Sequence, residues 1–283
     1  MKEKRRSFTA AHIRTYAAHL REQERSPATI QKYAHDLTAL LEYLDGQPLT
    51  KAALIGWKEH LTADHAPTTV NSMLAAVNGF LRFMSWHALT VRLLNVQRPL
   101  FREERRELSR AEYARLVSAA QRTGDERLAL ILQTICATGI RVSELKFITA
   151  EAVRSGRAEV SNKGKRRTVF LPDKLRRLLK AYLKKQKNTA GAVFVTRTGR
   201  PLDRSNIWRD MKRLCGRAGV EPSKVFPHNL RHLFARAYYA LEKDLARLAD
   251  ILGHSSVNTT RIYTMESGAV HARQISRMRL VIT

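Results

Sequence analysis

Apolar residues recur every three to four positions through the N-terminal third of the chain, which is the spacing of one helix face. One such stripe follows Ser26-Pro27, an N-cap residue with a first-turn proline, and ends at Gly46. Residues 67–84 carry another stripe, and the stretches 8–24 and 50–63 show the same spacing. The pattern therefore predicts an N-terminal domain of four amphipathic helices.

The pattern of the C-terminal part is mixed. Ser109-Arg-Ala-Glu112 has the form of a capping box at a helix start, and the largely apolar segment 126–138 predicts a second helix that stops at a glycine. Apolar and polar residues then alternate on both sides of residues 162–165, where Gly164 suits a tight turn, and this alternation predicts a β-hairpin. Residues 192–196 predict one more short strand.

Helical spacing returns in four later segments, at residues 173–187, 205–218, 228–241 and 244–252. The predicted fold class is therefore mainly α. It has a four-helix N-terminal domain and a mixed α/β C-terminal domain that is mostly helical with a small antiparallel sheet. An unperiodic stretch with a proline and a run of charges, residues 96–107, predicts a linker between domains at residues 1–95 and 108–283.

Charge narrows the class of partner. The 283 residues contain 51 Lys and Arg against 25 Asp and Glu, a formal net charge of +26. Residues 1–105 hold 15 of the basic and 10 of the acidic residues, so the remaining 36 basic and 15 acidic residues give the later part a charge of +21. Such a surface repels itself unless a polyanion neutralises it, so nucleic acid is the expected partner and a neutral metabolic enzyme is not. An anionic membrane surface is the weaker alternative.

Composition also bears on where the protein works. Hydrophobic residues make up 44% of the chain, enough to form a core, which excludes a disordered polycation. No run of about 18 apolar residues and no secretory signal occurs, so we expect a cytoplasmic protein without a membrane span. The only cysteines, Cys136 and Cys215, lack the close spacing of metal ligands, and we expect core thiols and no metal site.

Two patches early in the C-terminal domain combine charged side chains with turns. Arg141 follows the helix stop at Gly139, and Glu144 comes three residues later, where it can hold the guanidinium by a charged hydrogen bond. The basic run 163–167 forms the tip of the predicted hairpin. Taken alone, a structural ion pair and a solvated turn or general phosphate contact explain these patches better than catalysis does.

Two later patches place histidines near basic or aromatic residues. His228 and Arg231 are three residues apart at the start of a helix, so their side chains share a face where the helix dipole favours an anion such as phosphate. His254 follows a glycine helix stop and precedes Tyr263 by nine residues. Alone, each pattern is weak, because His-x-x-Arg is common by chance and a lone tyrosine is usually a packing residue.

The order of these residues resembles the active-site order of the tyrosine recombinase, or phage integrase, family, which is Arg, Lys, His-x-x-Arg, His or Trp, and Tyr. The matching positions are Arg141, Lys163, His228, Arg231, His254 and Tyr263. Residues 138–145 and 252–263 are also similar to the family's most specific local sequences, and the resemblance covers the whole chain. It favours a minimal member of the family, similar to Xer proteins or to resolvases of transposons.

The resemblance implies a fold and an assembly. Residues 1–95 would form a SAM-like core-binding domain, and residues 108–283 a catalytic domain whose C-terminal tail docks on a neighbouring protomer. The implied partners are a double-stranded DNA recombination site and further copies of the chain, which form a homotetramer on two DNA sites. Accessory proteins are further implied partners. The resemblance implies no membrane partner.

An activity follows from the same resemblance. Tyr263 attacks the scissile phosphate and forms a 3′-phosphotyrosyl link that conserves the bond energy, so neither a cofactor nor a metal is required. His228 assists proton transfer at the tyrosine, and Lys163 protonates the leaving 5′ oxygen. The strands are then exchanged through a Holliday junction.

The remaining positions are implied to hold the phosphate or to support the residues that do. Arg141 and Arg231 clamp the non-bridging oxygens, and His254 hydrogen-bonds the same phosphate. Glu144 positions Arg141. Outside the reaction centre, the predicted DNA contacts are Lys165, Arg166 and Arg167.

Several biological reactions fit this chemistry. The enzyme would resolve chromosome or plasmid dimers or transposon cointegrates, or would integrate and excise a mobile element. A type IB topoisomerase-like enzyme uses similar phosphotyrosine chemistry, and a DNA-binding regulator could keep the fold without the reaction. Retention of every active-site position of the family argues against the regulator.

Overall fold

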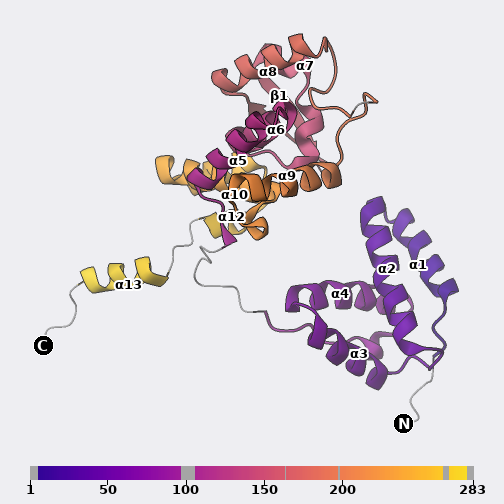
Figure 1. Cartoon of the computed structure of the whole chain (residues 1–283). Helices are drawn as coiled ribbons and strands as arrows, with labels where there is room; N and C mark the ends of the chain where they lie inside the picture. Colours follow the sequence, from indigo (N-terminus) through magenta and orange to yellow (C-terminus); the bar gives the residue numbers. More distant parts are fainter. Residues whose placement is uncertain (1–5, 97–105, 163, 197, 264–267, 279–283) are drawn as a thin grey trace, which may run out of the picture. The chain divides into compact units, whose positions relative to one another are not determined.

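Two compact units make up the chain, Met1–Arg98 and Pro99–Thr283 (Figure 1). The computed structural model describes residues 6–96, 106–162, 164–196, 198–263 and 268–278. Residues 97–105, most of the predicted linker, lie outside these ranges. Among the described residues, no helix is both long and apolar enough to cross a membrane.

The first unit contains the four helices that the apolar stripes predict. They are α1 (Ala10–Glu22), α2 (Pro27–Leu44), α3 (Lys51–Asp64) and α4 (Pro67–Phe83), followed by the short 3₁₀ helix η1 (His87–Leu89). Polar caps explain two of the starts, since the Ser26 hydroxyl accepts a hydrogen bond from the Thr29 N–H and the Thr50 hydroxyl accepts one from the Ala53 N–H. The buried core draws on all four helices, through side chains such as Tyr16, Leu37, Trp57 and Phe80.

The second unit contains the helices predicted for the C-terminal part. In chain order its α-helices are α5 (Arg110–Arg122), α6 (Glu126–Thr138), α7 (Ala150–Ser155), α8 (Asp173–Lys185), α9 (Arg204–Ala218), α10 (Pro227–Glu242), α11 (Leu245–Leu252), α12 (Val257–Thr260) and α13 (Gly268–Arg277). The 3₁₀ helices are η3 (Val142–Phe147), η4 (Pro222–Lys224) and η5 (Arg261–Tyr263). The predicted capping box at α5 is present, because Ser109 and Glu112 each accept a hydrogen bond from the other's backbone N–H.

A two-stranded antiparallel sheet interrupts these helices. Strand β1 (Arg157–Asn162) pairs with β2 (Lys165–Phe170) in a register that runs from Arg157 opposite Phe170 to Asn162 opposite Lys165. Gly164 lies in the turn with φ +76°, a backbone conformation that favours glycine. The predicted hairpin is confirmed, and its strands are longer than the alternation indicates.

The strand predicted at residues 192–196 is wrong. In the described chain this segment forms only two isolated bridges, through Ala192 and Val195. Val193 and Phe194 are adjacent in sequence and each is 2% exposed, so packing on the helical core buries both, whereas a strand would send them to opposite faces. The described residues provide no third strand for them to pair with.

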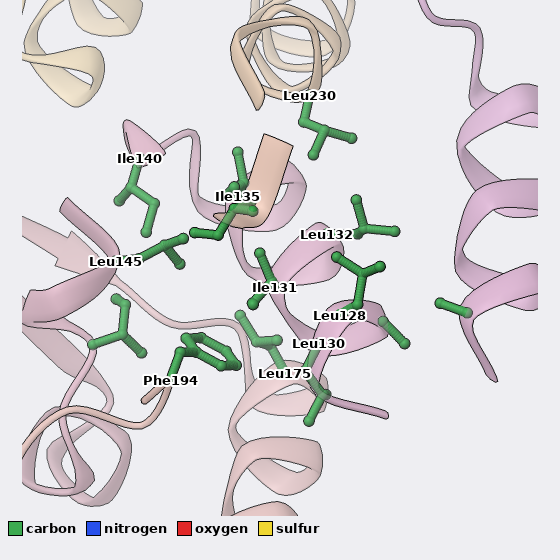
Figure 2. Packing of buried hydrophobic residues seen from close by; sticks show 14 of the residues in the cluster. Leu128, Leu130, Ile131, Leu132, Ile135, Ile140, Leu145, Leu175, Phe194 and Leu230 are labelled. Carbon is green, nitrogen blue, oxygen red and sulfur yellow. The ribbon is translucent and has the colours of Figure 1, made fainter. Parts of the chain in front are cut away.

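Helix α6 supplies much of the core of the second unit. Figure 2 shows Leu128, Ile131 and Ile135 of α6 among buried side chains from other elements, one of which is Leu230 of α10. These four side chains are almost fully buried. Because both helices are packed into one core, the C-terminal end of α6 and the first turns of α10 keep a fixed separation.

Gly139 marks the place where α6 ends against α10. It has φ +66°, and a Cβ atom added to it would lie 2.4 Å from the Phe234 ring. We expect Gly139→Ala to lower the free energy of unfolding by about 2 kcal/mol or more, because the change combines backbone strain with overpacking. Gly124→Ala is the matched control, since Gly124 has φ +74° but no atom within 4 Å of its Cβ position. Urea unfolding measures both variants, and equal losses would contradict the close contact.

Candidate active site

Arg231 lies at the centre of a group of polar residues in the second unit. It is 1% exposed, and its guanidinium donates from Nη1 to the Gly139 carbonyl at 2.5 Å and from Nη2 to the Leu252 carbonyl at 2.7 Å. These carbonyls belong to the C-terminal ends of α6 and α11, where the helix dipole favours a cation. Burial and the charge of Arg141 lower the pKa of Arg231 to about 10, which leaves it charged at neutral pH.

Arg141 is the second guanidinium of this group. It is the N-cap residue of η3, and its backbone N–H and Nη1 donate to the Glu144 carboxylate at 2.8 and 2.9 Å. Its Nη2 lies 3.4 Å from the Gly253 carbonyl. The Arg141 side chain is 31% exposed, so it is open to a ligand from solvent.

Glu144 is a buried carboxylate between two guanidiniums. Its side chain is 1% exposed, and it accepts hydrogen bonds from Arg167 Nη1 and Nη2 at 2.9 and 2.8 Å in addition to those from Arg141. Burial alone would raise its pKa, but the hydrogen bonds and charge of Arg167 and Arg141 outweigh that effect and lower the pKa to about 2. Glu144 is therefore ionised at neutral pH and holds two cations in place.

His254 follows the glycine that ends α11. Its Nδ1 lies 2.8 Å from the Thr260 hydroxyl, and its Nε2 lies 3.0 Å from Arg231 Nη2. Because a guanidinium only donates hydrogen bonds, Nε2 accepts here and Nδ1 carries the proton that it donates to Thr260. Burial and the neighbouring guanidiniums lower the pKa of His254 to about 4, so the ring is neutral at pH 7.

Tyr263 lies in η5 against the histidines of the group. It is 6% exposed, its ring stacks on that of His254 with centroids 6.2 Å apart, and it meets the His232 ring edge-on at 5.0 Å. Burial raises the pKa of its hydroxyl, while the charge of Arg231 and hydrogen bonding to it oppose that rise. The hydroxyl thus lies beside a buried cation that would stabilise a tyrosinate.

His228 and His232 occupy successive turns of α10. Partial desolvation of the His228 ring, followed by the charges of Arg231 and Arg141, lowers the pKa of His228. The two imidazole centroids are 4.3 Å apart. Burial lowers the pKa of His232 to about 3, and its Nε2 has no hydrogen-bond partner in the described part of the chain. His232 is missing from the predicted site, although its spacing of four residues from His228 places it on the same helix face.

The basic hairpin is described only in part. Lys163 and the side chain of Lys165 lie outside the described residues. Arg166 is exposed, whereas Arg167 points inward to Glu144. DNA contact by Lys165 and Arg166 therefore stays a prediction, and the inward direction of Arg167 argues against the DNA contact predicted for it. The structure brings the other predicted site residues together in one place. These residues are Arg141, Glu144, His228, Arg231, His254 and Tyr263.

Two further residues, Thr260 and Arg167, contact the site but were not assigned these contacts from the sequence. No local pattern marks Thr260, whose hydroxyl contacts His254 from a fully buried position. Arg167 does carry a signal, because strand alternation places it on the same face of β2 as Val169, which is 5% exposed. Within the described ranges, no cluster of three or more His, Cys, Asp or Glu could hold a metal ion.

Sequence relatives span nearly the whole chain. The phage integrase family matches residues 106–268, and the phage integrase N-terminal SAM-like domain matches residues 13–88. Tyrosine recombinase XerD of Xanthomonas campestris pv. campestris is 31% identical over 294 residues, which cover 90% of this chain and 88% of the relative.

Solved structures share the fold of the chain. A crystal structure of XerH site-specific recombinase bound to difH substrate, in a pre-cleavage complex, is 20% identical with a TM-score of 0.70 and covers 95% of this chain and 84% of its own. A lambda integrase tetramer bound to a Holliday junction is 18% identical with a TM-score of 0.74 and covers 91% of this chain and 77% of its own.

Proposed function

The chain belongs to the phage integrase family and is a Xer-like tyrosine site-specific recombinase, and we propose that the group around Tyr263 is the site at which it breaks and rejoins DNA. The observation that carries this proposal is the burial of Arg231 between two helix ends, beside both Tyr263 and His254. A preorganised buried cation next to a candidate nucleophile is what phosphoryl transfer requires, because negative charge grows on the phosphate oxygens in the transition state.

In the proposed reaction the Tyr263 oxygen attacks the phosphorus of the scissile phosphodiester. The bond from tyrosine to phosphorus forms as the bond to the 5′ oxygen breaks, which leaves a 3′-phosphotyrosyl link and a 5′ hydroxyl. His228 takes up the tyrosine proton, and Lys163 supplies the proton that the 5′ oxygen receives. Because the number of phosphoester bonds is unchanged, attack by another 5′ hydroxyl rejoins the strand without an external energy source.

Arg231, Arg141 and His254 are proposed to bind the non-bridging oxygens of that phosphate. Arg231 is fixed before DNA arrives, since both of its terminal nitrogens already donate to carbonyls. His254 Nε2 accepts a hydrogen bond from Arg231 in the free protein, so it must gain a proton, by tautomer exchange or protonation, before it can donate to a phosphate oxygen.

We also propose that the partner is a double-stranded recombination site and that four protomers act on two such sites, with accessory proteins where the site requires them. The net charge of +26 supports DNA binding, and the lambda integrase tetramer on a Holliday junction supports the assembly by analogy. Residues 1–95 would be the core-binding domain and residues 108–283 the catalytic domain, with residues 96–107 as the linker.

Helix α13 is proposed to dock on a neighbouring protomer, because Ile275 in the helix and Met278 just after it are 62% and 60% exposed. Deletion of the residues after 270 should leave the binding of one protomer to DNA intact and abolish cooperative assembly. Ile275→Ser should weaken that cooperativity, whereas Ser276→Ala, on the neighbouring exposed residue, should not. Band shifts on a duplex with two half-sites measure both effects, and a truncated protein that still assembles cooperatively would contradict the docking.

Recombination of plasmids that carry genomic fragments from around the gene tests the proposed function. A plasmid with two direct copies of the target should yield two circles if the enzyme resolves dimers or cointegrates, and efficient fusion of two single-copy plasmids would favour integration of a mobile element. Relaxation of plasmids that lack any such fragment would favour a type IB topoisomerase-like enzyme. Binding without a covalent adduct would favour a regulator.

A further inference from the structure

Arg167 is a nearly buried guanidinium in the second strand of the basic hairpin. Its side chain is 13% exposed, whereas Arg166 and Phe170, on the other face of β2, are exposed. Every nitrogen of its guanidinium donates a hydrogen bond, Nη1 and Nη2 to Glu144 at 2.9 and 2.8 Å and Nε to the Ile251 carbonyl at 3.0 Å. Arg167 therefore has no guanidinium nitrogen left for a DNA phosphate, whereas Nε of Arg231 has no hydrogen-bond partner among the described residues.

Glu144 joins Arg167 to Arg141. Its Oε1 accepts from the Nη1 atoms of both arginines, and its Oε2 accepts from Arg167 Nη2 and from the backbone N–H of Arg141. Arg167 therefore makes the bidentate contact, while the Arg141 side chain offers one nitrogen. Because Arg167 neutralises much of the carboxylate charge, the charge of Arg141 and its more exposed side chain stay available to an anion.

Arg167 also packs against the turn that presents His254. A Cβ atom added at Gly253 would lie 3.0 Å from Arg167 Cδ, so the arginine fills the space beneath this glycine. The Gly253 carbonyl in turn lies 3.4 Å from Arg141 Nη2. Arg167 thus contacts the two segments that carry the proposed phosphate ligands Arg141 and His254.

We propose that Arg167 is a positioning residue of the cleavage site, which holds Arg141 in its phosphate-binding orientation through Glu144 and makes no contact with DNA itself. The inference rests on the proposed role of Arg141 in binding the scissile phosphate. The alternative is that Arg167 is one more phosphate contact of the basic hairpin. A phosphate contact would change the affinity for DNA and its salt slope, whereas a positioning residue would change the rate of covalent adduct formation.

Arg167→Ala and Arg167→Lys separate these roles on a nicked duplex built from the genomic fragment that the wild-type protein binds most tightly. We expect the dissociation constant and its salt slope to stay within about twofold of wild type, and the single-turnover rate of covalent adduct formation to fall about 10- to 100-fold in Arg167→Ala. Arg167→Lys should recover little of that rate, because an ammonium cannot make the bidentate contact. A salt slope reduced by about 0.9, or an unchanged rate, would overturn the inference.

Arg166→Ala, at the exposed neighbour, is the matched control for a hairpin phosphate contact and should lower both the affinity and the salt slope. The thermal unfolding of each variant is measured first, and if Arg167→Ala does not fold, Arg167→Lys and Arg167→Gln carry the comparison. Wild-type protein that formed no adduct would overturn the proposed function and this inference with it. A wild-type adduct together with unimpaired Arg167 variants would overturn this inference alone.

A double-mutant cycle tests whether Arg167 acts through Glu144. In a Glu144→Gln background, Arg167→Ala should slow the covalent step by less than about twofold, because the acceptor that transmits its effect has lost its charge. The full 10- to 100-fold loss in that background would show that Arg167 acts by another route and would overturn the inference.

Discussion

Arg231→Lys should slow formation of the covalent DNA adduct by about 10²- to 10³-fold. The guanidinium reaches the Gly139 and Leu252 carbonyls with separate nitrogens and still faces Tyr263 and His254. An ammonium is one point charge on a flexible stem and cannot keep both carbonyl contacts while it binds a phosphate oxygen. The positive charge at position 231 would be retained, but the carbonyl contacts would no longer hold it in place before DNA binds.

The same substitution should also lower the free energy of unfolding by about 1–3 kcal/mol, because a buried carbonyl at one helix end loses its partner. Arg154→Lys is the matched control for the exchange of a guanidinium for an ammonium, since the Arg154 side chain is 58% exposed and pairs with Glu151 at the surface. It should leave the adduct rate within about twofold of wild type. Single-turnover rates of adduct formation at saturating DNA compare the two variants, and urea unfolding measures the loss of stability. An Arg231→Lys rate within tenfold of wild type would contradict the role of Arg231.

Tyr263→Phe should remove the covalent adduct altogether while DNA binding is retained. The hydroxyl oxygen is the proposed nucleophile, and no other group in the site can form the same phosphotyrosyl bond. The ring would keep its contacts with His232 and His254, so the free energy of unfolding should change by about 1 kcal/mol or less. Denaturing electrophoresis detects the adduct, and band shifts report binding by the same preparation.

Tyr239→Phe is the matched control for this loss. Tyr239 packs against the cluster that contains Tyr263, but its hydroxyl has no proposed part in the reaction. The variant should form adduct at the wild-type rate. Loss of the adduct in Tyr239→Phe, or its persistence in Tyr263→Phe, would contradict the assignment of the nucleophile.

Much of the fold could be predicted because its signals are local. Ser26-Pro27 and the Ser109–Glu112 capping box start helices where the sequence indicates, and Gly164 marks the hairpin turn through its positive φ. These features depend on hydrogen bonds within a few residues. The strand predicted at residues 192–196 failed because the burial of adjacent apolar residues comes from tertiary packing, which a short apolar run does not distinguish from strand pairing.

The candidate site also has a part that the sequence could indicate and a part that only the tertiary structure shows. The order of the charged residues along the chain indicated the family, but the meeting of the Gly139 and Leu252 carbonyls on Arg231 joins segments more than a hundred residues apart in sequence. No local pattern could show it. The inward direction of Arg167 was available from the alternation of β2, yet a run of basic residues looks alike whether its members face DNA or the core.

Identification of the amino acid that becomes linked to DNA tests the central claim most directly. Wild-type protein is incubated with the nicked duplex, the adduct is digested with nuclease and protease, and the nucleotide-bearing peptide is sequenced by mass spectrometry. We expect a single modified peptide in which the 3′ phosphate is carried by Tyr263. A nucleotide on any other residue, or tightly bound DNA with no covalent peptide at all, would contradict the account.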